Sequence, residues 1–448
     1  MAQRPRRQWV DGLRGIATFL VAFNHFFNGE IQSPYRSFWA HPSSANRHLI
    51  QLPPLRLLWA KDAMVPLFMI ISGYSISSNL LQTRNHSPSQ LTAHIRSSIC
   101  RRPIRLFLPV LLLSVPSHLI YYLKGYSHGF KDKVTLQIQP GVAPWRHVGY
   151  LLEFLLDGLN SINLQYNEGI NEQLWTMSYE FRGSCFTMLT IFIQAPWSPP
   201  ARLVSLAALM LYMCWYAYWD LLSFVAGLFL AELETDSPPR AGVRGEQSRG
   251  TFQALTFAAG VYLLCLPSAT GMDDASYPVG YGYLRVLSTW HWTQWSPWLD
   301  TQRMLQAVGA VLFFAGTLNA PWLQRFLCTH PVQAMGRISF PVYLLHISVY
   351  QLWRAPLRDA LWSLFTGEEY PSAEKGGAES LWVFLVVYVL AGVVLGSVVI
   401  AAARAYVRYV DWRVARMTRH VDRWLNGDGR DSQSEDRQMR EQEKDHRD

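Results

Sequence analysis

The sequence predicts an all-α fold, a polytopic membrane helical bundle of about ten transmembrane helices, and two observations support this. Half of the 448 residues are hydrophobic and only 16 % are charged, whereas roughly a quarter of the residues in a soluble domain are charged. A helix needs about 20 mostly apolar residues to cross a bilayer. About ten stretches approach that length, and they lie at Leu13–Phe27, Met64–Leu81, Leu106–Leu123, Leu174–Gln194, Leu203–Tyr216, Leu221–Leu233, Thr251–Leu266, Leu305–Leu318, Ile338–Leu352 and Leu381–Ala403.

Basic residues gather in alternate connections between these stretches, and this pattern predicts the orientation of the chain. Cytoplasmic loops of membrane proteins carry an excess of Lys and Arg, so both termini are expected in the cytosol. We expect a basic cytosolic N-terminus at residues 1–10, a membrane domain at 11–405 and a charged, disordered cytosolic tail at 406–448. The basic clusters are Arg4–Arg7, Arg96–Arg105, Arg240–Arg249 and Arg404–Arg423.

Composition and spacing argue against several classes of protein. The net charge of +8 is scattered over the connections and forms no single basic face, which argues against nucleic-acid binding. The five cysteines show neither a CxxC pair nor a zinc-ligand spacing. Neither a metal nor a bound cofactor is therefore expected. The first apolar stretch contains Asp11, Arg14, Asn24 and His25, which does not suit the apolar core of a signal peptide.

The first apolar stretch carries Asp11, Arg14 and His25 where charged groups are costly. A charge at the centre of a membrane helix costs at least about 2.5–3.5 kcal/mol, so such residues are functional candidates. The eleven-residue spacing of Arg14 and His25 returns them to nearly the same helix face, roughly 16 Å apart along the axis. Asp11 can pair with Arg14 one turn away. His25 suits a general base; alternatively, Arg14 contacts lipid phosphates and His25 bonds a neighbouring helix.

Two later stretches carry candidates of the same kind. Glu180 lies in the fourth apolar stretch. It could orient an imidazole, or it could pair with Arg182 or Arg14 without a catalytic part. Arg337 precedes the ninth stretch, and His346 lies roughly 13 Å deeper by helix rise. A lone histidine on an apolar face is more often a structural core residue than a catalytic one.

Two further segments suggest helix contacts and phosphate binding. Ser72 and Gly73 place small residues inside the second stretch, and small residues let membrane helices approach closely. Arg102 and Arg105 open the third stretch. Guanidinium groups bind phosphates in bidentate fashion, although the same arginines could serve only as topology anchors.

Five ordered segments resemble the acyltransferase-3 family, whose members are multi-span enzymes that move acyl groups from acyl-CoA to hydroxyl groups. Trp9 to Ala17, followed by Asn24-His25-Phe26, resembles the opening signature, and Arg14 and His25 meet its arginine–ten residues–histidine motif. The other four segments are Phe68–Tyr74, Arg102 with Arg105, Leu174-Trp175-Thr176 to Glu180 in a form common among fungal members, and Gly336–His346. This chain departs from the family pattern at Met69 and Ile70 in the second segment and at Pro341 in the last.

The resemblance implies a membrane-bound O-acyltransferase that takes an acyl group, most commonly acetyl, from acyl-CoA as co-substrate. It implies His25 as the catalytic residue, acting either as a base or as a transient acyl carrier, with Arg14 and Glu180 as partners. Arg14, Arg102 and Arg105 are expected to hold the phosphates of acyl-CoA. Candidates for substrate or structural roles are Asp11, Ser72, Tyr74, Trp175, Arg337 and His346.

Two rival functions would use the same residues. A proton-coupled transporter would employ Arg14, His25 and Glu180 as a proton relay, although the internal repeats common in transporters are not evident. A non-catalytic membrane scaffold would keep the fold alone. The expected partners are the bilayer, acyl-CoA and a hydroxylated acceptor. The sequence does not choose among metabolite, lipid and sugar acceptors, between endomembrane and plasma membrane, or among oligomeric states.

Overall fold

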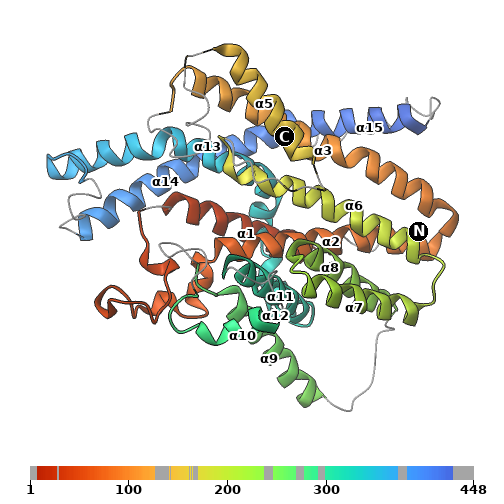
Figure 1. Ribbon diagram of the computed structural model, residues 1–448. Coiled ribbons are helices and arrows are strands. Elements are labelled where there is room, and N and C mark those ends of the chain that lie inside the picture. Colours follow the sequence, from red (N-terminus) through yellow and green to blue (C-terminus); the bar gives the residue numbers. More distant parts are fainter. Residues whose placement is uncertain are drawn as a thin grey trace. The chain divides into compact units, whose positions relative to one another are not determined.

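A computed structural model describes residues 8–27, 30–126, 143–160, 170–236, 246–268, 277–290, 298–371 and 381–426, with the single residues 141, 162 and 164. Over these residues every regular element is a helix, which confirms the predicted all-α class (Figure 1). The chain divides into two compact units. The first comprises Met1–Ile99 and Tyr179–Ser339, and the second comprises Cys100–Ser178 and Phe340–Asp448.

The first unit is built around α2 (Lys61–His86) and α8 (Trp219–Asp236), which form its most extensive helix pair. α1, α7 and α11 pack against this pair, and α9 packs on α11. The other helices of this unit are α1 (Gln8–Phe27), most of α6 (Thr176–Gln194), α7 (Pro199–Trp215), α9 (Glu246–Leu264), α10 (Arg285–Trp290), α11 (Trp298–Leu318), α12 (Pro321–Leu327) and the start of α13 (His330–Thr366).

Glycines make the closest helix contacts of the first unit possible. A Cβ on Gly73 of α2 would lie 2.4 Å from the carbonyl oxygen of Phe224 in α8, and one on Gly227 of α8 would lie 2.5 Å from the backbone nitrogen of Tyr74. A side chain at either position would therefore force the two helices apart. This agrees with the packing role that the Ser72-Gly73 step suggested.

The segment between α1 and α2 is held together by Arg56. It folds into four short 3-10 turns, η1 (Ser33–Tyr35), η2 (Ser43–Ala45), η3 (Leu49–Gln51) and η4 (Leu55–Trp59). Arg56 is 3 % exposed, and it donates to the backbone oxygens of Tyr35 and Arg36, each at 2.6 Å. Burial lowers the pKa of Arg56 to about 10. This segment is joined to residues after α9, because the hydroxyl of Ser37 donates to the backbone oxygen of Val279 at 2.6 Å.

In the second unit, α5 (Pro144–Leu159) runs antiparallel to the part of α3 (Pro88–Tyr122) that begins at Cys100. His147 of α5 lies 3.0 Å from His118 near the end of α3, whereas a Cβ on Gly158 would lie 3.8 Å from the ring of Phe107. The unit also holds η5 (Glu172–Trp175), most of α13, α14 (Leu381–Tyr406), a π-helical stretch η8 (Val407–Asp411) and α15 (Trp412–Asn426).

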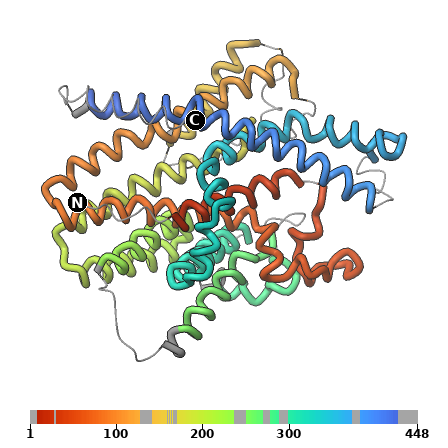
Figure 2. Tube along the Cα trace, turned by 180° about the vertical axis from the view of Figure 1, so that it is seen from behind, coloured from red at the N-terminus to blue at the C-terminus, as the bar shows by residue number. Residues whose placement is uncertain are grey.

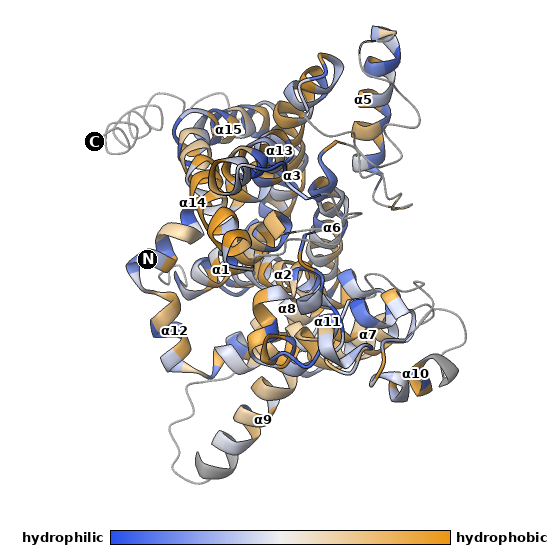
Figure 3. Ribbon diagram, turned by 90° about the vertical axis from the view of Figure 1, so that its left-hand side faces the viewer, coloured by the Kyte–Doolittle hydropathy of each residue, from blue (hydrophilic) through white to orange (hydrophobic). Residues whose placement is uncertain are grey.

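Apolar helices support membrane insertion, but the predicted number of about ten spans is not confirmed. Among the described residues, three helices are long and apolar enough to cross a bilayer: Lys61–His86, Pro88–Tyr122 and Trp382–Trp424. A fourth span would combine α11 and α12, which meet at a bend of 96°. α14 is the most uniformly hydrophobic helix (Figure 3). The other predicted stretches form shorter helices, or helices with too many polar residues, so their apolar runs fall below this threshold.

The first part of the expected disordered tail is helical. Of residues 406–448, the structure describes 406–426, which continue from α14 through η8 into α15. Residues 427–448 and 1–7 lie outside the described residues. The helix is possible because Val414 and Thr418, four residues apart, are buried on one face.

Candidate active site

The segments that carry Arg14 and Arg337 cross at two glycines in the first unit. A Cβ on Gly15 of α1 would lie 2.5 Å from the backbone nitrogen of Gly336 in α13, and one on Gly336 would lie 2.5 Å from the backbone oxygen of Asp11. The opening and closing motifs thus meet backbone to backbone. Arg14 and Arg337 each adjoin one of the crossing glycines, and Arg337 is exposed.

Tyr74 of the second motif packs near the start of the same helix α1. Its ring centroid lies 6.4 Å from that of Trp9 and 5.1 Å from that of Phe314 in α11. Tyr74 is 2 % exposed, and its hydroxyl donates to the carboxylate of Glu234 in α8. Tyr74 of α2 therefore contacts three other helices, α1, α8 and α11. Ser72 is half-buried in α2.

Arg14 pairs with Asp11, as the three-residue spacing predicted. The guanidinium Nη1 lies 3.4 Å from the Asp11 carboxylate, and the Arg14 side chain remains 30 % exposed. A group with this much accessible surface can contact a ligand without leaving its helix. Buried residues flank the pair along α1, with Gly12 and Leu13 between its two members and Gly15 directly after Arg14.

His25 lies in the last turn of α1, where the neighbouring Asn24 fixes the helix end. Asn24 is fully buried, and its side-chain nitrogen donates to the backbone oxygens of Leu20 at 2.7 Å and Leu58 at 2.8 Å. Tyr35 donates its hydroxyl to the backbone oxygen of Asn24 at 3.3 Å. The imidazole of His25 is half-buried, so it is held on a rigid element while part of it remains accessible.

Glu180 is half-exposed on α6, and the alternative that assigned its charge to Arg182 is not supported. Arg182 instead binds Asp220 at the start of α8, with its Nε 3.0 Å from the carboxylate. The guanidinium also lies over the ring of Tyr179, 5.6 Å from its centroid. Arg182 is thus engaged by α8 and by its own helix.

In the second unit, the fourth and fifth motifs meet through neutral hydrogen bonds. The hydroxyl of Tyr343 in α13 lies 2.8 Å from that of Thr176 and donates to the backbone oxygen of Gln173 at 3.0 Å. Gln173 donates from its side chain to the backbone oxygen of Leu344 at 2.6 Å. His346, one turn further, is fully buried, and its Nδ1 lies 3.1 Å from the backbone oxygen of Val342. This enclosure favours the structural interpretation of His346.

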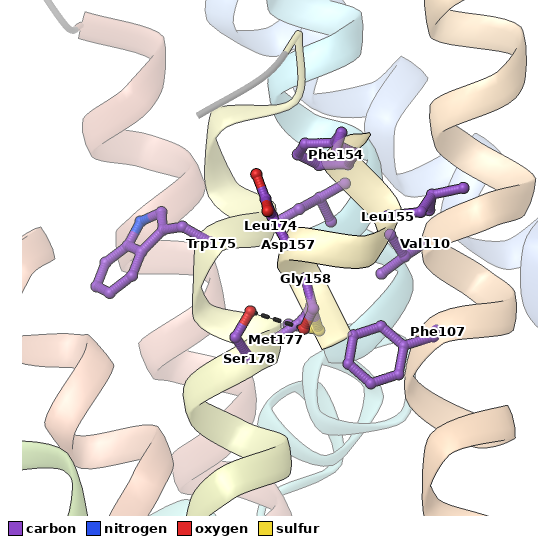
Figure 4. Close-up of a pocket in the computed structure, with 10 residues that line it drawn as sticks. All are labelled: Phe107, Val110, Phe154, Leu155, Asp157, Gly158, Leu174, Trp175, Met177 and Ser178. Atoms are coloured by element: carbon purple, nitrogen blue, oxygen red, sulfur yellow. Dashed lines mark hydrogen bonds between the residues drawn. The ribbon is translucent and has the colours of Figure 1, made fainter. Parts of the chain in front are cut away.

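Trp175 lies at a small pocket between α3, α5 and η5 (Figure 4). The pocket has a volume of about 20 Å³, enough for roughly one water-sized group. Trp175 points away from the apolar side chains on the opposite wall (Figure 4). That wall is mainly Phe107, Val110, Phe154 and Leu155, and Asp157 is its one carboxylate.

Arg102 and Arg105 lie on α3 at the edge of the second unit. Arg102 is half-exposed and Arg105 is exposed. The predicted site residues therefore fall in both units. Those in the first are Asp11, Arg14, His25, Ser72, Tyr74, Glu180 and Arg337, and those in the second are Arg102, Arg105, Trp175 and His346.

Sequence reasoning missed several residues that organise these segments. Trp9, Gln173 and Tyr343 lie inside or beside motifs, but nothing in their spacing indicated their partners. Glu232 is 1 % exposed and binds Arg84 at 2.9 Å. A glutamate inside an apolar stretch was the available signal for this ion pair.

Comparison with known proteins agrees with the family resemblance of the sequence motifs. A family model for the acyltransferase domain of the acyltransferase-3 family matches residues 7–402. No solved structure matches the chain.

Three curated fungal proteins are similar to most of this chain. The O-acetyltransferase PaAT-1 of Phomopsis amygdali is 24 % identical over 376 residues, covering 75 % of this chain and 71 % of that protein. The acyltransferase clz18 of Cochliobolus lunatus is 24 % identical, covering 82 % of this chain and 87 % of that protein. The acyltransferase R4 of Phoma sp. (strain ATCC 20986 / MF5453) is 23 % identical, covering 90 % and 93 %.

Proposed function

The chain belongs to the acyltransferase-3 family and is a transferase, and from this premise we propose that it is a multi-pass membrane O-acyltransferase using acyl-CoA. The proposed reaction moves an acyl group, acetyl in particular, to a hydroxyl of a small metabolite, lipid or sugar. The name of one relative, an O-acetyltransferase, supports acetyl transfer to oxygen. The observation that carries the proposal is the pair Arg14 and His25 on one helix within the matched region.

His25 is the proposed catalytic residue. As a base, its neutral imidazole takes the proton of the acceptor hydroxyl while the hydroxyl oxygen attacks the thioester carbonyl and the CoA thiolate leaves. As an acyl carrier, the imidazole nitrogen itself attacks the thioester, releases the thiolate and passes the acyl group to the hydroxyl. Both routes need an accessible imidazole on a fixed backbone, which the half-buried His25 beside the anchored Asn24 offers.

The proposed roles of the other site residues are based on the charges of their side chains. Arg14 of the first unit, and Arg102 and Arg105 of the second, are each proposed as phosphate-binding groups for the donor, because a guanidinium group can form two parallel hydrogen bonds to phosphate oxygens. Glu180 would orient or balance a cationic group during transfer. These assignments make the donor KM sensitive to the arginines and kcat sensitive to His25.

The test replaces His25 with Ala and measures transfer from radiolabelled acetyl-CoA in membranes that contain candidate acceptors. Loss of a positioned base should lower the rate by about 10²–10⁴-fold. His330→Ala is the matched control, because His330 is an exposed histidine at the start of α13. Normal activity of a well-folded His25→Ala protein would overturn the assignment.

A second measurement separates the two routes. Wild-type protein is mixed with labelled acetyl-CoA without acceptor, quenched and examined for label on the protein. Label that requires His25 supports the carrier route, and protein without label supports direct transfer with His25 as the base.

A further inference from the structure

α15 (Trp412–Asn426) lies beyond the region that the family model matches and carries a stripe of arginines. Arg416 and Arg419 are exposed and Arg423 is half-exposed. Their spacing of three and four residues places them on one side of the helix. This stripe is therefore a feature of this chain that the matched region, residues 7–402, does not contain.

α15 is held against α3 within the second unit. An ion pair joins Asp422 of α15 to Arg101 of α3 at 3.8 Å. The two helices lie side by side and run in opposite directions (Figures 1 and 2). Val414 and Thr418 are buried on the inner side of α15, so the position of its outer surface is fixed by packing.

The ion pair brings the arginines of the two helices into one neighbourhood. Arg105 lies one turn after Arg101 on α3, and Arg419 lies one turn before Asp422 on α15. Because the helices are antiparallel, both steps lead in the same direction from the ion pair. Arg105 and Arg419 are both exposed. Guanidinium groups that project from two adjacent helices can bind the oxygens of one phosphate-bearing ligand.

We propose that Arg419 of α15 completes, with Arg105 and Arg102 of α3, a binding site for the phosphates of the acyl-CoA donor. The proposal rests on the proposed acyl-CoA-dependent function. A donor with several phosphate groups matches guanidinium groups from two helices, and each group can form paired hydrogen bonds to phosphate oxygens. Lipid headgroups present the same phosphate chemistry, so the experiment separates the two sources.

The experiment compares Arg419→Gln with wild type in nanodiscs with and without phosphatidylserine, using three donors. These are acetyl-CoA, acetyl-3′-dephospho-CoA and acetyl-pantetheine, which lacks the nucleotide. The KM for acetyl-CoA should rise about fivefold to tenfold, as expected for a lost charged contact, while the KM for acetyl-pantetheine should not change. Arg419→Lys should recover part of the loss.

Arg413→Gln is the matched control on the same helix. Arg413 lies on the face opposite Asp422, donates to the backbone oxygen of Tyr409 and stacks on Trp412 at 5.1 Å. Its kinetics should match those of wild type. Arg105→Gln combined with Arg419→Gln should raise the donor KM by less than the product of the single effects, because both bind one ligand.

Three results would overturn the proposal. An unchanged acetyl-CoA KM removes Arg419 from the site, and an equal effect on acetyl-pantetheine indicates a structural role. An effect of Arg419→Gln that depends on the phosphatidylserine content of the nanodisc, and not on the donor, assigns the stripe to lipid headgroups. Failure of the proposed function is a different result, because the wild type would then transfer nothing from any of the three donors.

Discussion

The two units bury their polar groups in different ways. In the first, the carboxylate of Glu232 in α8 binds Arg84 of α2 at 2.9 Å and also binds Arg202 of α7. None of these three side chains is more than 8 % exposed. A charged network therefore joins three helices inside this unit.

In the second unit, the contacts that join Tyr343 of α13 to η5 and the start of α6 are neutral. Tyr343, Thr176 and Gln173 share hydrogen bonds of 2.8 to 3.0 Å. The ion pair between Arg101 and Asp422 is longer, at 3.8 Å, and leaves Arg101 36 % exposed. A buried charge in this chain therefore does not by itself indicate catalysis, because Glu232 and Asp220, each 1 % exposed, are paired with arginines of other helices.

The largest effect is expected from Glu232→Leu. This change leaves Arg84 and Arg202 buried without their carboxylate, which should destabilise the protein by about 3–5 kcal/mol. The measurement is the apparent melting temperature of detergent-solubilised protein, followed by size-exclusion chromatography with fluorescence detection.

The control for Glu232→Leu removes the whole network. Combining it with Arg84→Met and Arg202→Met eliminates the unpaired charges, so most of the lost stability should return. A single Glu232→Leu variant with the melting temperature of wild type would contradict the structural role of the ion pair.

A smaller effect is expected from Tyr343→Phe in the second unit. The change removes one hydroxyl and its bonds to Thr176 and Gln173, which should cost about 1–2 kcal/mol. Tyr409→Phe is the control, because Tyr409 belongs to the same unit and is 54 % exposed. If both variants melt at the same temperature as wild type, the neutral network does not stabilise the unit.

Helical periodicity was sufficient to predict the local features of the site. The spacing of Asp11 and Arg14 predicted their pairing, which the structure confirms at 3.4 Å. A small residue at Gly73 predicted close helix packing, which the contact with Phe224 confirms. Both are properties of one helix and its immediate surface, so they can be derived from a short segment.

Tertiary pairing could not be derived in the same way. The sequence offered Glu180 as a partner of Arg182, but the fold places Asp220 of α8 beside it. The contact of Gly15 with Gly336 joins segments from opposite ends of the matched region. Many charges and small residues were available, and only the packing of the helices selects among them.

The helix α15 was not predicted, because of the charged composition of its sequence. The charged composition of the tail at 406–448 predicted disorder, yet α15 buries Val414 and Thr418. Two buried positions in two helical turns give too weak a periodic pattern to be recognised among so many charged residues. The average composition of the tail therefore could not predict this helix, which depends on a few individual buried residues.

The smallest effect on stability is expected from Asp11→Asn, and it sharpens the comparison of structural and functional charges. The Asp11–Arg14 pair is partly exposed, and such pairs contribute about 0–1 kcal/mol, so the melting temperature should change little. Without the Asp11 carboxylate, the direction of the Arg14 guanidinium should be less fixed, and the KM for acyl-CoA should rise. A lower melting temperature with an unchanged donor KM would place this pair with Glu232 among the structural charges and would leave His25 without its proposed donor-binding neighbour.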